Sequence, residues 1–308
     1  MSGPYLEFSR AEWSKLSLAT PLPLTENDIV RLRGLGDPIS LAEVDAIYRP
    51  ISRLLNLYIK AAGALNDATS AFLGELVPKA PYLVGITGSV AVGKTTVARV
   101  LREMIARWPE TPQVALVTTD AFLFPNEELA RRGLMDRKGF PKTYDRAALL
   151  DFVQRVKADE PEVTAPVYSH VIYDIIPGAT TTVRQPDVLI LEGLNILQPD
   201  ENGIAGTVGL DDYLDFSIYV DANTADIRNW YIDRFLALRA TAFQKPDSYF
   251  RRFAELPDAE AIELAAGLWE NINEPNLDEN ILPTRSRANL VLVKGGNHNV
   301  TEVLLKRR

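Results

Sequence analysis

The stretch GITGSVAVGKTTVARV, residues 85–100, decides the fold of this chain. Gly88 and Gly93 bracket four residues, and Lys94 and Thr95 follow at once, which matches the pattern G-x-x-x-x-G-K-[ST]. Glycines permit a tight loop whose backbone N–H groups point inward, and a following helix adds the positive end of its dipole. The stretch therefore predicts a cradle for the phosphates of a nucleoside triphosphate.

The neighbours of this loop agree with that interpretation, because an apolar run precedes it and an amphipathic stretch, TTVARVLREMIARW, follows it. The Lys94 side chain is expected to reach the β- and γ-phosphates, and the Thr95 hydroxyl to bind Mg²⁺. The alternative is an ordinary strand–helix turn that carries a lysine by accident. The expected nucleotide-binding residues are Gly88, Ser89, Val90, Ala91, Val92, Gly93, Lys94, Thr95 and Thr96.

Short apolar runs alternate with longer amphipathic stretches after residue 81, which predicts an α/β fold with a mainly parallel sheet flanked by helices. The runs show little strict alternation of polar and apolar residues, as expected of strands buried on both faces. The expected strands are residues 82–87, 114–119, 188–193, 216–221 and 289–294.

The N-terminal part, residues 1–80, is predicted to be helical and to pack on a core formed by residues 81–308, the two making one compact domain. Apolar residues recur at helical spacing from Leu41 to Tyr58, and Pro50 is expected to kink or break this run. Further along, residues 200–209 are the best candidate for a surface loop.

Composition excludes several classes of function. A net charge of −8 argues against a general nucleic-acid binder, although it leaves room for a local basic pocket. The chain has no cysteine and only two histidines, so disulfides, thiolate metal sites and histidine-rich metal clusters are excluded. The N-terminus does not resemble a signal peptide and no apolar run is long enough to span a bilayer, so we expect a cytoplasmic protein without a membrane partner.

Two acidic residues follow predicted strands. Asp120 ends the run VALVTTD and Glu192 ends VLILE, which places both at the carboxyl edge of the sheet, where ligands bind in such folds. Asp120 could accept the proton of an attacking hydroxyl, or it could be a helix cap or turn residue. Glu192 is assigned to the Mg²⁺ shell. Because no N-K-x-D guanine-reading sequence is present, a small-molecule kinase fits better than a GTPase.

The segment APVYSHVIYDIIPG, residues 165–178, is a candidate acceptor site, because it crowds Tyr168, His170 and Tyr173 into one short stretch. Polar aromatic side chains can pack on an apolar acceptor while their tips form hydrogen bonds to it. An ordinary surface hairpin is the alternative.

A helix predicted at residues 225–243 places Tyr231, Arg234 and Leu238 on one stripe. An arginine on such a face needs an anion, either from a ligand or from a structural salt bridge. The asparagine-rich stretch at residues 271–285 contains two prolines and predicts a loop beside a helix end.

Together these residues resemble bacterial type I pantothenate kinase, from about residue 5 to the C-terminus. Several of the matching strings are specific to that family, unlike the phosphate loop. The resemblance implies a P-loop kinase fold, a homodimer, and transfer of phosphate from ATP, with Mg²⁺, to the primary hydroxyl of pantothenate. It also implies inhibition by coenzyme A at a site that overlaps the nucleotide site. The matching strings are GSVAVGKTT, TTDAFLFPN, RKGFPKTYD, PVYSHVIYDIIPG, PDVLILEGLN, YVDA, RFLALR and NILPTR.

The resemblance also implies residue roles. Asp120 matches the catalytic carboxylate, while Lys94 and Arg234 would offset charge on the transferring phosphoryl group. Arg99 and His170 are implied to contact coenzyme A, and His298 to lie near the adenine. The implied pantothenate pocket consists of Tyr168, His170, Tyr173, Tyr231, Arg234 and Asn273.

One departure from the family is the loop QPDENGIAGTVG, residues 198–209, which is longer than expected. Two rival interpretations remain. A relative of uridine kinase or phosphoribulokinase would share the phosphate loop and ILEG, but not YSHVIYDIIPG or NILPTR. A non-catalytic sensor of ATP or coenzyme A would have no need of a base such as Asp120.

Overall fold

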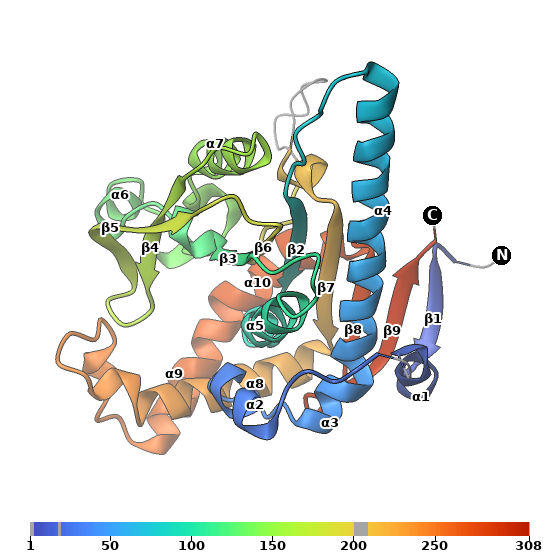
Figure 1. Ribbon diagram of the computed structural model, residues 1–308. Helices are drawn as coiled ribbons and strands as arrows, with labels where there is room; N and C mark the ends of the chain where they lie inside the picture. Colours follow the sequence, from blue (N-terminus) through green and yellow to red (C-terminus); the bar gives the residue numbers. More distant parts are fainter. Residues whose placement is uncertain (1–2, 18–19, 200–208, 308) are drawn as a thin grey trace.

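The centre of the protein is a seven-stranded sheet, seen in a computed structural model that describes residues 3–17, 20–199 and 209–307 (Figure 1). Its strand order is β1-β9-β8-β7-β2-β6-β3. The five strands from β8 to β3 run parallel to one another, and each coincides with a predicted apolar run. They are β2 (Tyr82–Gly88), β3 (Val114–Thr118), β6 (Val188–Glu192), β7 (Phe216–Ala222) and β8 (Leu290–Lys294).

Two antiparallel strands extend one edge of the sheet. β9 (Val300–Lys306) pairs with β8, and β1 (Tyr5–Ser9) pairs with β9. The prediction that residues 1–80 are helical is therefore wrong at β1. The five residues of β1 carry no helical period, and their backbone groups are satisfied by a strand almost 300 residues away, which local sequence does not reveal.

The predicted helical run around Pro50 is interrupted as expected. Residues Val44–Tyr48 form a π-helical turn, and Pro50 lies in the first turn of the long helix α4, where its missing N–H is tolerated. The α-helices of the described residues are α1 (Arg10–Ser14), α2 (Glu26–Leu32), α3 (Leu41–Glu43), α4 (Arg49–Leu73), α5 (Lys94–Ile105), α6 (Asn126–Arg131), α7 (Arg146–Lys157), α8 (Thr224–Arg239), α9 (Asp258–Leu268) and α10 (Glu274–Asn276).

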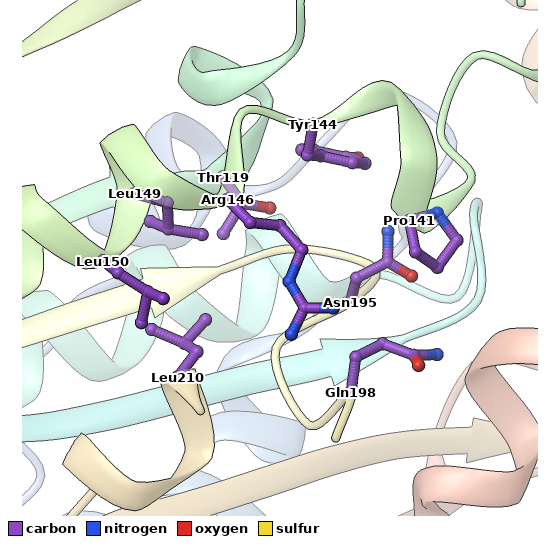
Figure 2. Close-up of a pocket in the computed structure, with 9 residues that line it drawn as sticks. All are labelled: Thr119, Pro141, Tyr144, Arg146, Leu149, Leu150, Asn195, Gln198 and Leu210. Atoms are coloured by element: carbon purple, nitrogen blue, oxygen red, sulfur yellow. The ribbon is translucent and has the colours of Figure 1, made fainter. Parts of the chain in front are cut away.

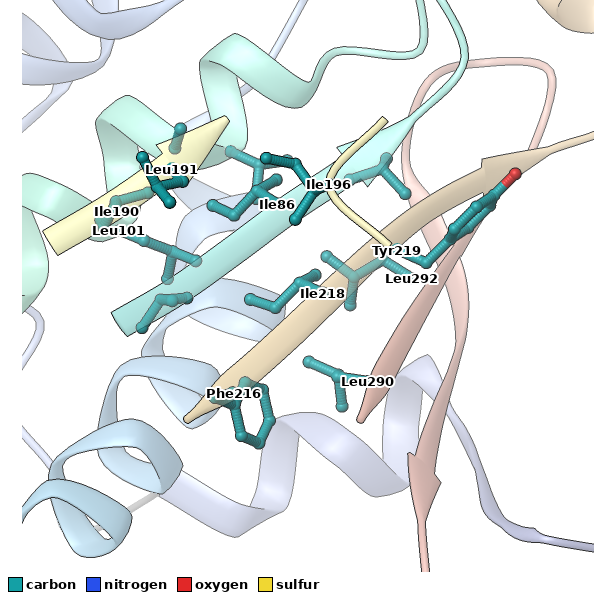
Figure 3. Close-up of a cluster of buried hydrophobic side chains, with 14 of the residues drawn as sticks. Ile86, Leu101, Ile190, Leu191, Ile196, Phe216, Ile218, Tyr219, Leu290 and Leu292 are labelled. Atoms are coloured by element: carbon teal, nitrogen blue, oxygen red, sulfur yellow. The ribbon is translucent and has the colours of Figure 1, made fainter. Parts of the chain in front are cut away.

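The core forms where neighbouring strands place apolar side chains in the same row. Ile86 lies opposite Ile218, which in turn lies opposite Leu290, and all three side chains are fully buried (Figure 3). Burial of each such side chain stabilises the fold by roughly 1.5–3 kcal/mol. On the other side of Ile86 the same row continues to Glu192. The carboxylate of Glu192 therefore lies at the carboxyl edge of the sheet, at the end of this apolar row.

A separate hairpin of β4 (Val163–Ser169) and β5 (Asp174–Val183) stands beside the β3 edge, near α6 and α7 (Figure 1). Residues 271–285 are helical rather than a loop, which corrects the prediction. Two π-helical turns flank α10, and Pro275 and Pro283 each lie in a first turn, so neither proline breaks the helical path.

Within the described residues, no helix combines the length and the apolar character needed to cross a bilayer. The candidate surface loop at residues 200–209 lies, except for Gly209, outside the described residues.

Candidate active site

The phosphate loop connects β2 to α5 and has the strained backbone that its glycines allow. Gly88 has φ +142° and Gly93 has φ +94°, and a Cβ on Gly88 would overlap the Val220 carbonyl oxygen. Ala91 also has positive φ, at +62°. This backbone leads into the N-terminus of a twelve-residue helix, an arrangement that suits binding of an anion.

Lys94 lies folded over this loop, where its Nζ donates a hydrogen bond to the Ser89 carbonyl oxygen at 2.7 Å. Burial lowers the pKa of Lys94, and the nearby carboxylates of Glu192 and Asp120 oppose that effect. A phosphate bound in the loop would favour the charged ammonium in the same way. Lys94 is therefore placed to receive a polyanion.

The Thr95 hydroxyl donates to Glu192 Oε2 at 3.1 Å, which joins the start of α5 to the end of β6. Burial raises the pKa of Glu192, and the Lys94 charge opposes that rise. A hydroxyl and a carboxylate are both oxygen donors, as Mg²⁺ requires. No cluster of three or more potential metal ligands of the His, Cys, Asp and Glu types occurs in the described part of the chain.

Asp120 lies in the 3₁₀ turn that follows β3. The backbone N–H of Asp120 donates to the Thr118 hydroxyl at 3.3 Å, so Thr118 is the cap of this turn. The Asp120 carboxylate instead accepts a hydrogen bond from the Tyr144 hydroxyl, 3.3 Å from Oδ1. The negative charge of Asp120 raises the pKa of both Lys94 and Glu192. The alternative of a capping aspartate is not supported by this geometry.

The β4–β5 hairpin contributes an aromatic wall. The Tyr168 ring lies 5.1 Å from the His170 ring and 6.4 Å from the Tyr173 ring. The ring of Phe250, in the segment between α8 and α9, packs against the Tyr173 ring, with 4.9 Å between the ring centroids. Burial lowers the pKa of His170, so its imidazole is neutral near pH 7. The negative charge of Asp120 opposes this shift. The hairpin thus faces the phosphate-binding edge.

Helix α8 presents Tyr231 and Arg234 to the same region. Arg234 forms no salt bridge in the parts of the chain that the structure describes. Its positive charge lowers the pKa values of Lys94, Glu192 and His170. An unpaired guanidinium among these groups favours a ligand anion over a structural partner. Asn273 forms a side-chain hydrogen bond to Tyr231.

His298 lies next to the phosphate loop but stacks on protein rather than facing solvent. Its ring is 4.0 Å from the Trp230 ring, and its Nδ1 is 4.0 Å from Asp37 Oδ1. A Cβ on Gly93 would lie 2.5 Å from the other oxygen of Asp37. Burial lowers the pKa of His298.

Arg99 is exposed on α5, one turn after Thr95. Its charge lowers the pKa of His170, although burial is the larger cause of that shift. Arg99 and His170, which come from distant parts of the sequence, therefore border the same region.

Sequence reasoning missed Lys138, Tyr144 and Asp37 as members of this site. Lys138 lies 4.2 Å from the centroid of the Tyr173 ring. Lys138 and Tyr144 belong to the string RKGFPKTYD, which matches the family, but no spacing rule singles out either residue. Asp37 sits in a loop between α2 and α3, and only the tertiary fold brings it to Gly93.

A small cavity adjoins this site without forming part of the predicted acceptor pocket (Figure 2). Its volume is about 30 Å³, which suffices for water rather than for a substrate. Thr119, Tyr144 and Asn195 line it, and two of their polar atoms, Thr119 Oγ1 and Asn195 Oδ1, are buried without a hydrogen-bond partner among the described residues.

Comparison with known proteins gives consistent matches. The sequence pattern of the Phosphoribulokinase / Uridine kinase family matches residues 83–244. A pantothenate kinase of Clavibacter sepedonicus is 59% identical over 304 residues, covering 99% of this chain and 95% of that protein. A pantothenate kinase of Streptomyces coelicolor is 56% identical over 308 residues, covering 99% of this chain and 94% of that protein.

Among solved structures, a D-glycerate 3-kinase from Cryptococcus neoformans superimposes with a TM-score of 0.53. The match covers 82% of this chain and 98% of that chain at 14% identity, so it shows a shared fold alone.

Proposed function

The chain belongs to the pantothenate kinase family, and we infer that it transfers the terminal phosphate of ATP to the primary hydroxyl of pantothenate, the first step of coenzyme A synthesis. The rival activities, those of a uridine kinase or a phosphoribulokinase, are disfavoured by identity of 52–59% to pantothenate kinases over nearly the whole chain. The sensor interpretation is disfavoured because those relatives are named as kinases.

The observation that carries the proposed chemistry is the position of Asp120 beside the phosphate loop. One carboxylate oxygen is held by Tyr144, and the carboxylate charge reaches Lys94. In the proposed reaction, Asp120 orients the acceptor hydroxyl and takes its proton as the phosphoryl group transfers. Lys94 and Arg234 offset the charge that spreads over the transferring group, and such an arginine can contribute about 10³-fold or more in rate.

Thr95 and Glu192 are the residues that would hold Mg²⁺. When bound, Mg²⁺ neutralises charge on the nucleotide phosphates. The 3.1 Å hydrogen bond between the Thr95 hydroxyl and Glu192 supports this assignment, because the two oxygens lie close enough to bind one ion.

The proposed acceptor pocket lies between the β4–β5 hairpin and α8. Its residues supply hydroxyl, imidazole, amide and guanidinium groups that match the hydroxyls, amide and carboxylate of pantothenate. A pocket that leaves these groups unpaired would reject analogues that lack the matching polar atoms. The proposed pocket residues are Tyr168, His170, Tyr173, Tyr231, Arg234 and Asn273.

Coenzyme A is proposed as a feedback inhibitor that contacts Arg99 and His170. The shared electrostatic environment of these two residues supports this, because a phosphate bound at Arg99 would lie beside the pocket that contains His170. His298 is proposed to lie near the adenine, since Asp37 connects it to the phosphate loop.

We also propose a cytoplasmic homodimer. The second half of α4 supports the dimer, because it leaves large apolar side chains in water. Leu65 is 70% exposed and Phe72 is 88% exposed, and Leu76 just beyond the helix is 88% exposed. A second copy would remove this surface from water.

The experiment that tests this function measures ADP release with Mg·ATP and, in turn, pantothenate, uridine and ribulose 5-phosphate. The expected result is stimulation by pantothenate alone, with 4′-phosphopantothenate identified by mass spectrometry. Stimulation by another acceptor would overturn the substrate assignment. The absence of stimulation by any acceptor would favour the sensor.

A further inference from the structure

Tyr144 is a buried tyrosine whose hydroxyl reaches the proposed catalytic carboxylate. It follows the 3₁₀ turn Pro141–Thr143, and its hydroxyl lies 3.3 Å from Asp120 Oδ1. Its side chain is 6% exposed. Burial and the Asp120 charge together raise the pKa of Tyr144 far above its ordinary value, so the hydroxyl keeps its proton and donates it to the hydrogen bond.

The backbone around Tyr144 is fixed to the backbone around Asp120. Leu123 and Tyr144 form an antiparallel bridge, and the Phe124 N–H donates to the Thr143 carbonyl oxygen at 2.9 Å. The distance from the Tyr144 Cα to the turn that carries Asp120 is therefore set by main-chain hydrogen bonds rather than by a mobile side chain.

The segment before Tyr144 is braced from two other elements. The Gly139 carbonyl oxygen accepts hydrogen bonds from Asn195 Nδ2 and Asn276 Nδ2, each at 3.1 Å. The Gly139 N–H donates to the Thr143 hydroxyl at 3.0 Å. Asn195 follows β6, the strand that ends at Glu192, so this network joins the position of Tyr144 to the strand that carries the proposed metal ligand.

The hydrogen bonds at Asp120 are divided between its two oxygens. Oδ1 accepts from Tyr144, whereas Oδ2 has no hydrogen-bond donor among the described residues. We propose that Tyr144 is a positioning residue, which holds Oδ1 so that Oδ2 faces the hydroxyl of the acceptor. This inference rests on the proposed function, because it assigns Tyr144 a role through Asp120.

The test compares kcat and both KM values for wild type, Tyr144→Phe, Asp120→Asn and the double variant, with ATP and pantothenate as substrates. Tyr144→Phe removes only the hydroxyl and keeps the ring that borders the cavity of Figure 2. Tyr213→Phe is the matched control, because the Tyr213 hydroxyl accepts a hydrogen bond at 2.8 Å from Gln154, which is not a proposed site residue.

The expected result is a kcat for Tyr144→Phe that falls about 10- to 100-fold, as for loss of a hydrogen bond to a charged group, with both KM values within about twofold. In the Asp120→Asn background the same substitution should lower kcat by less than about twofold, because the carboxylate it positions is gone. Tyr213→Phe should match wild type.

Three results would overturn the inference. The first is a Tyr144→Phe variant with wild-type kcat while Asp120→Asn is inactive, which leaves the proposed function intact. The second is an equal fold-loss from Tyr144→Phe in both backgrounds, which indicates a role independent of Asp120. The third is a rise in both KM values with the loss in kcat, the pattern of a loosened pocket. A wild-type enzyme without pantothenate-dependent transfer would instead refute the proposed function, and the inference with it.

Discussion

Lys138 is a buried cation at the edge of the proposed acceptor pocket. Its Nζ donates to Asn126 Oδ1 and to the Tyr173 carbonyl oxygen, each at 2.6 Å. Burial lowers the pKa of Lys138 to about 8, and the charges of Asp174 and Asp120 oppose that shift. Its charge can therefore change within a range of pH that is easily reached in an assay.

We expect the KM for pantothenate to rise as pH increases through about 8. The Lys138 ammonium is charged below that pH and attracts the anionic acceptor, and the attraction is lost when the group becomes neutral. A rise of roughly threefold to tenfold between pH 7 and pH 9.5 is expected, corresponding to about 1 kcal/mol of lost charge attraction.

Two variants provide the controls for this pH profile. Lys138→Met should have the raised KM already at pH 7 and no rise thereafter. Lys138→Arg should keep a low KM throughout, because a guanidinium stays charged. A wild-type KM that is constant up to pH 9.5 would contradict the role given to Lys138.

The site residues differ in how far sequence could predict them. Lys94 and Thr95 belong to a contiguous motif, and Asp120 and Glu192 each end an apolar run, so local pattern indicated all four. Tyr144 was missed, because a buried tyrosine reaches a carboxylate 24 positions away only through folding. Local sequence records the ends of strands but not which loops fold back over them.

Among the elements, the phosphate loop depends most on a single backbone conformation. Gly88→Ala should destabilise the protein by about 1–3 kcal/mol, because φ +142° is strained for any residue with a Cβ and the obstructing Val220 oxygen belongs to the main chain of β7. ATP affinity should fall with it. Urea unfolding and nucleotide titration measure the two effects.

Gly267→Ala is the matched control for that substitution. Gly267 lies in α9, and a Cβ there meets no other atom within 4 Å. An alanine should be neutral or stabilising by about 0.5–1 kcal/mol. If Gly88→Ala unfolds at the same urea concentration as wild type and binds ATP equally well, the strain argument is wrong.

The elements that sequence predicted best are those with a strong local pattern. All five parallel strands were predicted, because each is an apolar run bounded by turns. β1 was missed because its partner lies at the other end of the chain. Pro275 and Pro283 lead to the prediction of a loop at residues 271–285, yet both prolines occupy first turns, where the lost hydrogen bond costs little.

At the scale of the whole molecule, we propose that residues 1–80 and 81–308 form one folding unit. Trp13 and Ile47 belong to the same buried apolar cluster as Leu292 of the sheet. Glu43 adds a polar link, since its Oε1 accepts from the Val300 N–H at 2.8 Å. These contacts support a shared core rather than an appended helical domain.

The proposed homodimer also belongs to this scale. The double variant Leu65→Asp, Phe72→Asp places two charges on the exposed half of α4, so it should halve the mass seen in analytical ultracentrifugation. Ile262→Asp is the control, because Ile262 is 43% exposed on α9 and should leave the mass unchanged. A wild-type protein that sediments as a monomer would exclude the dimer.

The measurement that tests the central claim most directly is transfer of the terminal phosphate of ATP to pantothenate by wild type and by Asp120→Asn, with ATP affinity measured in parallel. We predict that wild type forms 4′-phosphopantothenate, and that the variant binds ATP normally but transfers phosphate about 10²- to 10⁴-fold more slowly. Transfer by Asp120→Asn at the wild-type rate would contradict the role of Asp120 as the base that receives the acceptor proton.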